Sequence, residues 1–412
     1  MTKSDLLFLV VLLTLPIQLG KHFFFSYSYI FGLPIDYRAL TIYASDIAIV
    51  AYLTFFLFEN RKKLKSFFKA YRQPALAIAG LDFYLLAQSL IFASPASIIF
   101  SIKTTLFSLL ALCAAHTLSK KSTSGAAFFV FKITLVTEAL ILIAEFIRQK
   151  SLHLAIFGER TFDATTTSIA HANLFGNQFL RSYGTFPHPN AAAAFLVFGL
   201  ILILGIEADR KRPNVSVFSL LVVLSGLAVT FSKSALATLA VALGIIFARK
   251  KGFIVLLIGV LALSILLLKN TSDSSLPTIS ERLLLIQKSL DISHASPLFG
   301  VGSNNFILEL SKLNLFSVAQ VRLLQPVHNI FFLILAEEGI LGLLLFTALL
   351  FVVLKFVDTK IKIALFVSIL IFGSIDHFLW TLQQGQLLLW LSLGYILSNV
   401  RGKLIDTGKH AN

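Results

Sequence analysis

The chain alternates between long apolar runs and short polar segments. An α-helix needs about 20 apolar residues to cross the roughly 30 Å of hydrocarbon in a bilayer, and many of the runs approach this length. On this pattern we predict about twelve membrane-spanning helices, near residues 6–19, 39–58, 74–94, 97–118, 125–149, 187–206, 215–231, 234–248, 252–268, 328–354, 363–377 and 384–400. An even number of spans leaves both chain termini on one side of the membrane.

The first apolar run has an alternative reading as a secretory signal peptide, because Lys3 precedes it. The residues that follow the run, Gln18-Leu19-Gly20, are a poor substitute for the small-x-small cleavage site of a signal peptide. We therefore interpret residues 6–19 as the first span.

Composition agrees with a polytopic membrane protein. The 412 residues are 57% hydrophobic and 13% charged, and the mean hydropathy is +0.86, which a soluble protein of this length does not need. The excess of 35 Lys and Arg over 20 Asp and Glu suggests nucleic-acid binding at first sight. These cations lie in short loops between apolar runs, so we predict a membrane protein with no nucleic-acid partner. The single cysteine, Cys113, excludes an intramolecular disulfide.

The basic loops orient the chain in the membrane. Clusters of Lys and Arg fill alternate loops, at 61–65, 120–121, 210–212, 249–251 and 355–362. The positive-inside rule makes these loops and both termini cytoplasmic. The outer face then receives residues 20–38, 150–186, 231–233, 269–327 and 378–383.

The largest outer loop, 269–327, is predicted to be helical. Apolar residues recur at helical spacing and indicate an amphipathic helix on the outer leaflet: Ile279, Leu283, Ile286 and Leu290. Pro297, Gly300 and Gly302 predict a turn. Ser303 is a plausible N-cap for a second helix that carries Phe306, Leu310 and Leu313.

The outer face collects cations and imidazoles but few carboxylates. Its candidate functional residues are Arg181, His188, Asn190, Ser232, Lys233, Arg282, Arg322, His328, Asn329 and Asp376. Arg and Lys suit a phosphate or pyrophosphate, and a histidine can take a proton from a hydroxyl nucleophile. Paired carboxylates with ligand-like spacing do not occur on this face, so we predict no metal and no cofactor.

Each of these residues also has a purely structural interpretation. Arg181, Arg282 and Arg322 can be membrane-edge charges that meet lipid phosphates. His188 can be a rigid turn residue between Pro187 and Pro189. Lys233 can be an ordinary loop charge, and His328 with Asn329 can cap a helix. Their coincidence on one face favours a functional site.

Charged residues inside the spans are expected to be structural. Asp46 and Lys103 fall at similar depths of the second and fourth spans, which predicts a buried ion pair. Asp82, Glu138, Glu145 and one of Glu337 or Glu338 also fall within apolar runs. For these we expect structural pairing or protonation rather than catalysis.

Several motifs resemble those of the O-antigen ligase/polymerase superfamily. The first runs from Arg181 through Gly184 and Phe186 to His188-Pro189-Asn190, and the second is the turn Thr230-Phe231-Ser232-Lys233-Ser234. Arg282, the segment 297–306, His328-Asn329 and the run 336–342 resemble the family's large periplasmic loop and the span after it. The resemblance covers residues 181–345. Lys233 stands where many members have Arg, which keeps the charge but loses the planar fork.

The resemblance implies a metal-independent, membrane-embedded glycosyltransferase of the GT-C type in the bacterial inner membrane. Such enzymes pass a glycan from undecaprenyl pyrophosphate to an acceptor hydroxyl on the periplasmic face, and in the ligases the acceptor is lipid A-core. The family's essential histidine maps onto His328 and its essential cations onto Arg181 and Arg282. Lys233 and Arg322 are further expected to bind pyrophosphate, with His188, Asn190, Ser232, Asn329 and Asp376 in support.

The predicted fold is an all-α polytopic membrane protein with a large helical periplasmic loop. It divides into N-terminal spans (1–150), a ligase-like core (151–355) that includes the outer loops, and C-terminal spans with a cytoplasmic tail (356–412). An O-antigen ligase that acts on lipid A-core or another glycolipid is the favoured function. A polymerase of lipid-linked repeats uses the same donor and stays open, and the alternative of another class is a transporter or lipid flippase. The six-span halves that are common in twelve-span transporters are not evident in the sequence.

Overall fold

A computed structural model describes residues 1–167, 169–174, 176–208, 216–247, 271–272, 279–316 and 322–399. The predicted span at 252–268 and the basic clusters at 210–212 and 249–251 lie outside the described residues. The described part is mostly helical.

Each of the other eleven predicted spans overlaps a helix. These helices are α1 (Lys3–Thr14), α2 (Ala44–Asn60), α4 (Arg72–Ile91), α5 (Pro95–Leu118), α6 (Lys121–Arg148), α7 (Pro189–Ala208), α8 (Val217–Ala228), α9 (Lys233–Phe247), α13 (Ile330–Leu354), α14 (Lys360–Ile375) and α16 (Gln383–Leu397). By length and composition, five of the described helices can cross a membrane: α4, α5, α6, α7 and α13. These five support a helical membrane protein.

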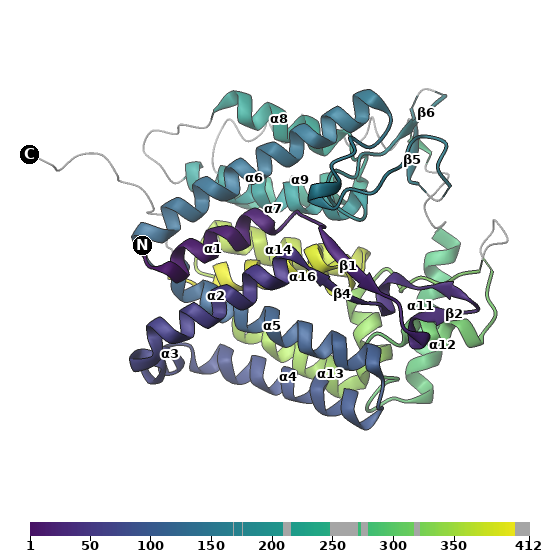
Figure 1. The fold of residues 1–412 in the computed structure, drawn as a ribbon, viewed down its shortest axis with the longest axis horizontal. Coiled ribbons are helices and arrows are strands. Elements are labelled where there is room, and N and C mark those ends of the chain that lie inside the picture. Colours follow the sequence, from purple (N-terminus) through teal and green to yellow (C-terminus); the bar gives the residue numbers. More distant parts are fainter. Residues whose placement is uncertain are drawn as a thin grey trace, which may run out of the picture.

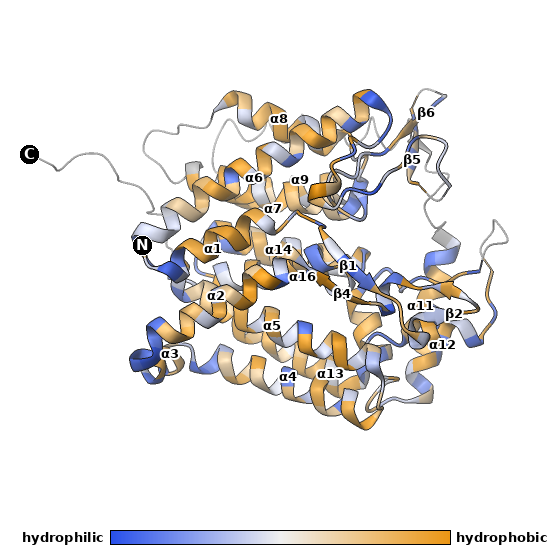
Figure 2. Cartoon of the chain, in the orientation of Figure 1, coloured by the Kyte–Doolittle hydropathy of each residue, from blue (hydrophilic) through white to orange (hydrophobic). Residues whose placement is uncertain are grey.

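The helices lie side by side and share one apolar core (Figures 1 and 2). In Figure 1, α4 lies below α5 and packs against both α5 and α13, and α8 lies above α7. Helix α16 packs against α5, and α14 packs against α9. The basic turn η3 (Arg61–Lys63) and helix α3 (Leu64–Ala70) lie at the end of the helices opposite the strands. This arrangement agrees with basic loops on one side and the candidate site on the other.

The outer segments contain short strands that the helical expectation did not include. Strand β1 (Gly20–Phe23) pairs antiparallel with β4 (Leu40–Tyr43), and β2 (Tyr29–Ile30) pairs with β3 (Leu33–Pro34). Strand β5 (His171–Leu174) pairs with β6 (Asn177–Leu180) and β7 (Thr271–Ser272). Strand pairing satisfies the backbone groups of these segments. Three-residue 3-10 helices are interspersed: η1 (Ser26–Ser28), η2 (Asp36–Arg38) and η4 (Ala155–Phe157).

The described part of the large outer loop is helical, as predicted. Helix α11 (Ile279–Ala295) is followed by a turn in which Gly300 and Gly302 have φ of +65° and +92°, a conformation that glycine adopts without a Cβ penalty. Helix α12 (Phe306–Lys312) begins after Asn305, so the prediction that Ser303 is its N-cap is wrong. The Ser303 hydroxyl instead donates to Gln88 Oε1 across the fold at 3.3 Å.

The turn after α11 is anchored on helix α13. A Cβ added to Gly300 would lie 2.3 Å from the Glu337 carbonyl oxygen, and one added to Gly339 would lie 2.4 Å from the Leu298 carbonyl oxygen. Gly339 has a φ of +66° and interrupts the helix at this contact. The Gly302 amide then donates to the Glu337 carbonyl at 2.8 Å. The two glycine-containing motifs of the sequence therefore form one packed joint, which fixes the outer loop to a span.

Several charges inside the spans have structural partners, whereas the buried carboxylate oxygens of Glu338 have no hydrogen-bond partner among the described residues. Lys103 Nζ lies 3.1 Å from Asp46 Oδ2, which confirms the predicted ion pair. Glu145 accepts hydrogen bonds from the amides of Tyr183 and Gly184, at 2.8 and 2.7 Å. Glu138 accepts one from the Thr185 amide at 2.8 Å. One face of α6 thus holds the backbone of the segment that leads into α7.

Short helix α15 (Phe378–Thr381) connects α14 with α16. It turns the chain at the same end of the molecule as the strands. The polar residues on both of its sides, Asp376-His377 and Gln383-Gln384, are therefore brought into the neighbourhood of the outer segments.

Candidate functional site

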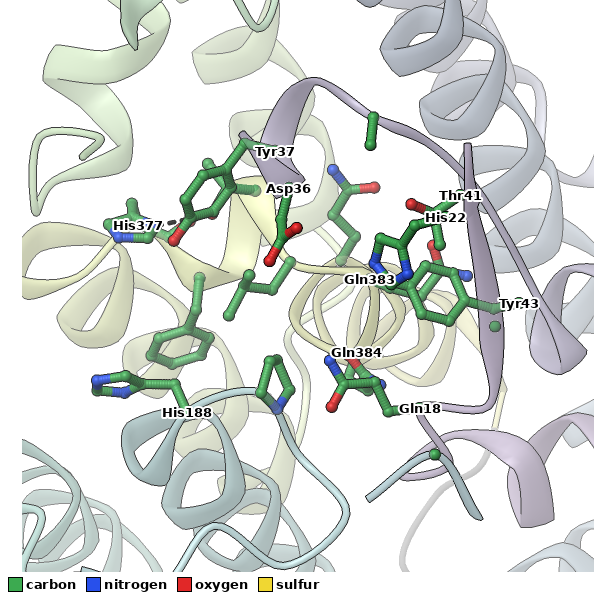
Figure 3. Close-up of a pocket in the computed structure, with 18 of the residues that line it drawn as sticks. Gln18, His22, Asp36, Tyr37, Thr41, Tyr43, His188, His377, Gln383 and Gln384 are labelled. Carbon is green, nitrogen blue, oxygen red and sulfur yellow. Dashed lines mark hydrogen bonds between the residues drawn. The ribbon is translucent and has the colours of Figure 1, made fainter. Parts of the chain in front are cut away.

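A polar cavity of about 610 Å³ opens among the outer segments. Its walls come from residues 18–43, the outer end of α5, the loop that leads into α7, the start of α13, and the α14–α16 connection. The volume lies within the roughly 300–1,000 Å³ typical of small-molecule sites. Figure 3 shows His188 and His377 on one side of the cavity and His22, Tyr43 and Gln383 on the other. We call the first side the imidazole half; it consists of Arg160, Tyr183, His188, His328, Asp376 and His377.

His328 lies beside a carboxylate in the imidazole half. Its Nδ1 is 3.7 Å from Asp376 Oδ1, which is longer than a hydrogen bond, and its ring centroid is 5.1 Å from that of His377. Both ring nitrogens are buried and have no hydrogen-bond partner among the described residues, although 12% of the side chain is exposed. In the alternative interpretation of His328 with Asn329 as a helix cap, the capping residue of α13 is Asn329.

Asp376 is held as an anion by its surroundings. Asn190 Nδ2 donates to Oδ2 at 3.0 Å, and the His377 amide donates to Oδ1 at 2.7 Å. Burial works against the charge of this carboxyl, but the adjacent His328 imidazole, together with His377 and His188, holds its pKa well below the usual value.

The two other histidines of the imidazole half are neutral near pH 7. Burial lowers the pKa of His188 to about 4 and that of His377 to about 3, and the nearby Asp376 carboxylate does not compensate for it. His188 Nδ1 accepts a hydrogen bond from the Asn190 amide at 3.1 Å. His377 Nδ1 lies 2.7 Å from Thr381 Oγ1. These contacts fix the orientation of both rings.

Arg181 lies behind the cavity wall, with 1% of its surface exposed. Its Nε donates to the Thr230 carbonyl and its Nη2 to Asn190 Oδ1, both at 2.8 Å. The Ser232 hydroxyl donates to the same Asn190 oxygen at 3.1 Å. Asn190 therefore connects Arg181 and Ser232 with Asp376. Arg181 does not touch the cavity itself and is linked to it by the Asn190 side chain.

The remaining predicted residues do not line the cavity. Lys233 is half-buried at the first residue of α9. Arg282 is in the first turn of α11 and is near enough to His377 to influence its charge. The guanidinium of Arg322 lies 3.7 Å from the ring centroid of Phe31. Asn329 Oδ1 accepts hydrogen bonds from the amides of Phe331 and Phe332, which is the helix-capping role.

Other cavity residues were not singled out from the sequence. Arg160 lines the imidazole half; its Nη2 donates to the Pro187 carbonyl at 2.9 Å, and its guanidinium lies 5.7 Å from the ring centroid of Tyr183. Tyr37 meets the ring of His377 edge-on, with centroids 5.8 Å apart. In the sequence, only the positive charge of Arg160 in a predicted outer loop indicated a site residue. No feature of the sequence indicated Tyr37.

The imidazole half also contains a group that can share a metal ion. Within the described ranges, His328, Asp376 and His377 are the set whose ligand atoms lie within 4.8 Å of one another. Two imidazoles and one carboxylate are ligands that zinc accepts. The predicted absence of a metal can therefore be tested at these three residues.

The fold and the cavity together define a class of protein. Apolar helices long enough to cross a membrane carry, at one end, a polar cavity with imidazoles, an anionic carboxylate and cations. These features define a helical membrane protein with a polar cavity at one end of its helices.

Comparison with known protein families shows which family part of the chain resembles. Residues 190–347 match the family described as O-antigen ligase, which confirms the similarity to the O-antigen ligase superfamily over this part of the chain. The matched segment contains Asn190, Ser232, Arg282 and His328, while Arg181, His188 and Asp376 lie outside it. No curated protein matches the chain. The family match supports a membrane enzyme of the O-antigen ligase or polymerase type, with polysaccharide and lipid substrates.

Proposed function

We propose that this protein is an O-antigen ligase. It transfers a glycan from undecaprenyl pyrophosphate to a hydroxyl of lipid A-core at the outer face of the bacterial inner membrane, without a metal. The observation that carries the proposal is His328: a buried imidazole whose nitrogens have no partner among the described residues, set beside an anionic carboxylate in a polar cavity.

In the proposed reaction, His328 takes the proton from the acceptor hydroxyl. The acceptor oxygen forms a bond to the anomeric carbon while the bond from that carbon to the pyrophosphate oxygen breaks, with inversion. Asp376 stabilises the imidazolium that forms, because its carboxylate lies 3.7 Å from Nδ1. Undecaprenyl pyrophosphate leaves with the bonding electron pair. No covalent intermediate on the enzyme is needed.

The cations have two different roles in this mechanism. Arg160 in the cavity wall and Arg282, which lies outside the wall but near His377, hold the departing pyrophosphate in this proposal and stabilise its developing charge. Arg181 is a positioning residue, since it holds Asn190, which in turn holds Asp376. Lys233, next to Ser232, adds positive charge behind the same wall. Arg322 lies against Phe31, so we give it no part in the chemistry.

The test is transfer by the purified protein in detergent or liposomes. The donor is undecaprenyl-pyrophosphate-linked glycan, offered with and without lipid A-core, in buffer with EDTA or with added Zn²⁺. We expect glycan-bearing lipid A-core that forms only when both substrates are present and at an unchanged rate in EDTA. Loss of transfer in EDTA with recovery on Zn²⁺ would overturn metal independence.

The same assay separates the alternatives. Lengthening of the lipid-linked glycan without lipid A-core would identify a polymerase in place of a ligase. A protein that turns over neither substrate pair but moves a labelled lipid-linked glycan across a liposome membrane would be a flippase.

A further inference from the structure

The β1–β4 hairpin presents one of its faces to the cavity. In the register of this pair His22 lies opposite Thr41, and Gly20 lies opposite Tyr43. Side chains alternate between the two faces of a strand, and these four residues line the cavity while their sequence neighbours Lys21 and Ile42 do not. Gly20 is required here, because a Cβ would lie 2.6 Å from Tyr43 Cδ1.

Gln18 and Gln384 complete this part of the cavity, which we call the hairpin half (Figure 3). Its surface offers amides, a hydroxyl and two aromatic rings, those of His22 and Tyr43, which meet edge to face with centroids 6.0 Å apart. Such groups supply both hydrogen-bond donors and acceptors. They suit a ligand that has several hydroxyl groups around an apolar frame.

The hairpin half carries no uncompensated cation among the residues described for it. Lys103 borders it, but its ammonium group is bonded to Asp46 Oδ2 at 3.1 Å and to Gln383 Oε1 at 2.9 Å. Gln383 Nε2 in turn donates to Asp46 Oδ1 at 2.6 Å. Asp36 and Arg38 of η2 also line the cavity. The Asp36 carboxylate faces the space between the two halves in Figure 3, and the Arg38 guanidinium donates to the Tyr27 and Asn304 carbonyls and to Asn305 Oδ1. An anionic ligand is therefore disfavoured here, and an uncharged one fits.

Gln384 provides the observation that points to a ligand. It is 1% exposed, it lies in the first turn of α16 against the cavity, and its Nε2 has no hydrogen-bond partner among the residues that the structure describes. A buried donor without an acceptor costs free energy. A ligand oxygen in the cavity would remove that cost, and the unsatisfied amide thus indicates where an acceptor atom belongs.

We propose that the hairpin half is a binding site for an uncharged sugar ring of the reacting glycan, with Gln384 Nε2 donating to a sugar oxygen. The site rests on the proposed function, because that function brings a glycan into this cavity. In this proposal, a glycan whose anomeric carbon lies beside His328 extends along the same cavity into the hairpin half. The sugar belongs either to the donor or to the acceptor, and both have the same chemistry.

The experiment measures binding rather than turnover, so that it is independent of whether the protein is a ligase. Three ligands are titrated separately into purified protein: bare undecaprenyl pyrophosphate, the same lipid with its glycan, and lipid A-core. The variants are Gln384→Leu and Thr41→Val, which remove one polar group each at similar volume. Gln287→Leu, at an exposed position on α11, is the matched control. Thermal unfolding checks that each variant is folded.

We expect Gln384→Leu to bind one sugar-bearing ligand about fivefold to tenfold more weakly, the loss of one hydrogen bond to a neutral group, with Thr41→Val in the same direction. Weaker binding of the glycan-linked donor alone assigns the sugar to the donor, and weaker binding of lipid A-core alone assigns it to the acceptor. Binding of bare undecaprenyl pyrophosphate stays unchanged in both cases. Unchanged affinity for all three ligands, or an equal loss for the bare lipid, would overturn the proposal. A protein that binds these ligands as expected but fails to transfer glycan would count against the proposed function alone.

Discussion

The two halves of the cavity differ in how their polar groups are used. In the imidazole half, Asp376 receives hydrogen bonds from Asn190 and from the backbone, and the neighbouring rings of His188 and His377 are fixed by further contacts. The two ring nitrogens of His328 have no hydrogen-bond partner among the described residues. In the hairpin half the ions compensate one another, and the unsatisfied group is a neutral amide. The difference is the one that our two proposals require, in which one half moves a proton and the other recognises an uncharged ligand.

Of the variants that test this comparison, Asp376→Asn is expected to change the rate of glycan transfer most. Asp376→Asn keeps the shape and can still bond Asn190, but it removes the negative charge that stabilises an imidazolium at His328. We expect the rate of transfer to fall by about 10²- to 10⁴-fold, with donor affinity nearly unchanged. The measurement is the steady-state rate at saturating substrates.

Asp291→Asn is the control for that change. Asp291 is half-exposed on α11 and pairs only with Lys288 among the described residues, so its loss should leave transfer intact. A similar rate for Asp376→Asn and the unmodified protein would show that the imidazole half needs no carboxylate.

A smaller effect is expected in the pH dependence of stability. Burial lowers the pKa of His377 to about 3 and of His188 to about 4, against about 6.5 in an unfolded chain. Between these values the unfolded chain binds more protons, so folding loses stability as the pH falls below about 6.5. The contribution of these two rings to the melting temperature should therefore fall from pH 7 to pH 5.

The variant His377→Gln should flatten this drop, because it removes one of the two rings that must stay neutral. His294→Gln, at an exposed position on α11, should retain the full pH dependence. If His377→Gln and the unmodified protein lose the same number of degrees between pH 7 and pH 5, the ring of His377 is not kept neutral by burial.

Much of the helical frame could be predicted from sequence because it depends on composition. Apolar runs of sufficient length gave the helices, and a pair of opposite charges at matching depth, Asp46 and Lys103, gave an ion pair that the structure confirms. The turn at Gly300 and Gly302 could be predicted because glycine adopts its positive-φ backbone conformation without a Cβ penalty. These features depend on local chemistry.

The cavity could not be predicted from the sequence, because it is formed by contacts between segments that lie far apart along the chain. Strands β1 and β4 are four residues each and pair across sixteen intervening residues, so neither gives a clear period of its own. The direction of the Arg181 side chain, away from the cavity and onto Asn190, follows from the packing of α7 against the α8–α9 turn. Gln384 is distinguished by its buried amide nitrogen, which has no hydrogen-bond partner among the described residues; this property depends on packing and cannot be read from the sequence.

The most direct test of the central claim is the single-turnover rate of His328→Ala with undecaprenyl-pyrophosphate-linked glycan and lipid A-core. His294→Ala serves as the matched control, and donor binding is measured in parallel. If His328 takes the acceptor proton, transfer by His328→Ala falls by about 10²- to 10⁴-fold while donor binding and protein yield are retained. Full transfer by His328→Ala at an unchanged protein level would contradict the role of this histidine and, with it, the assignment of the imidazole half as the place of reaction.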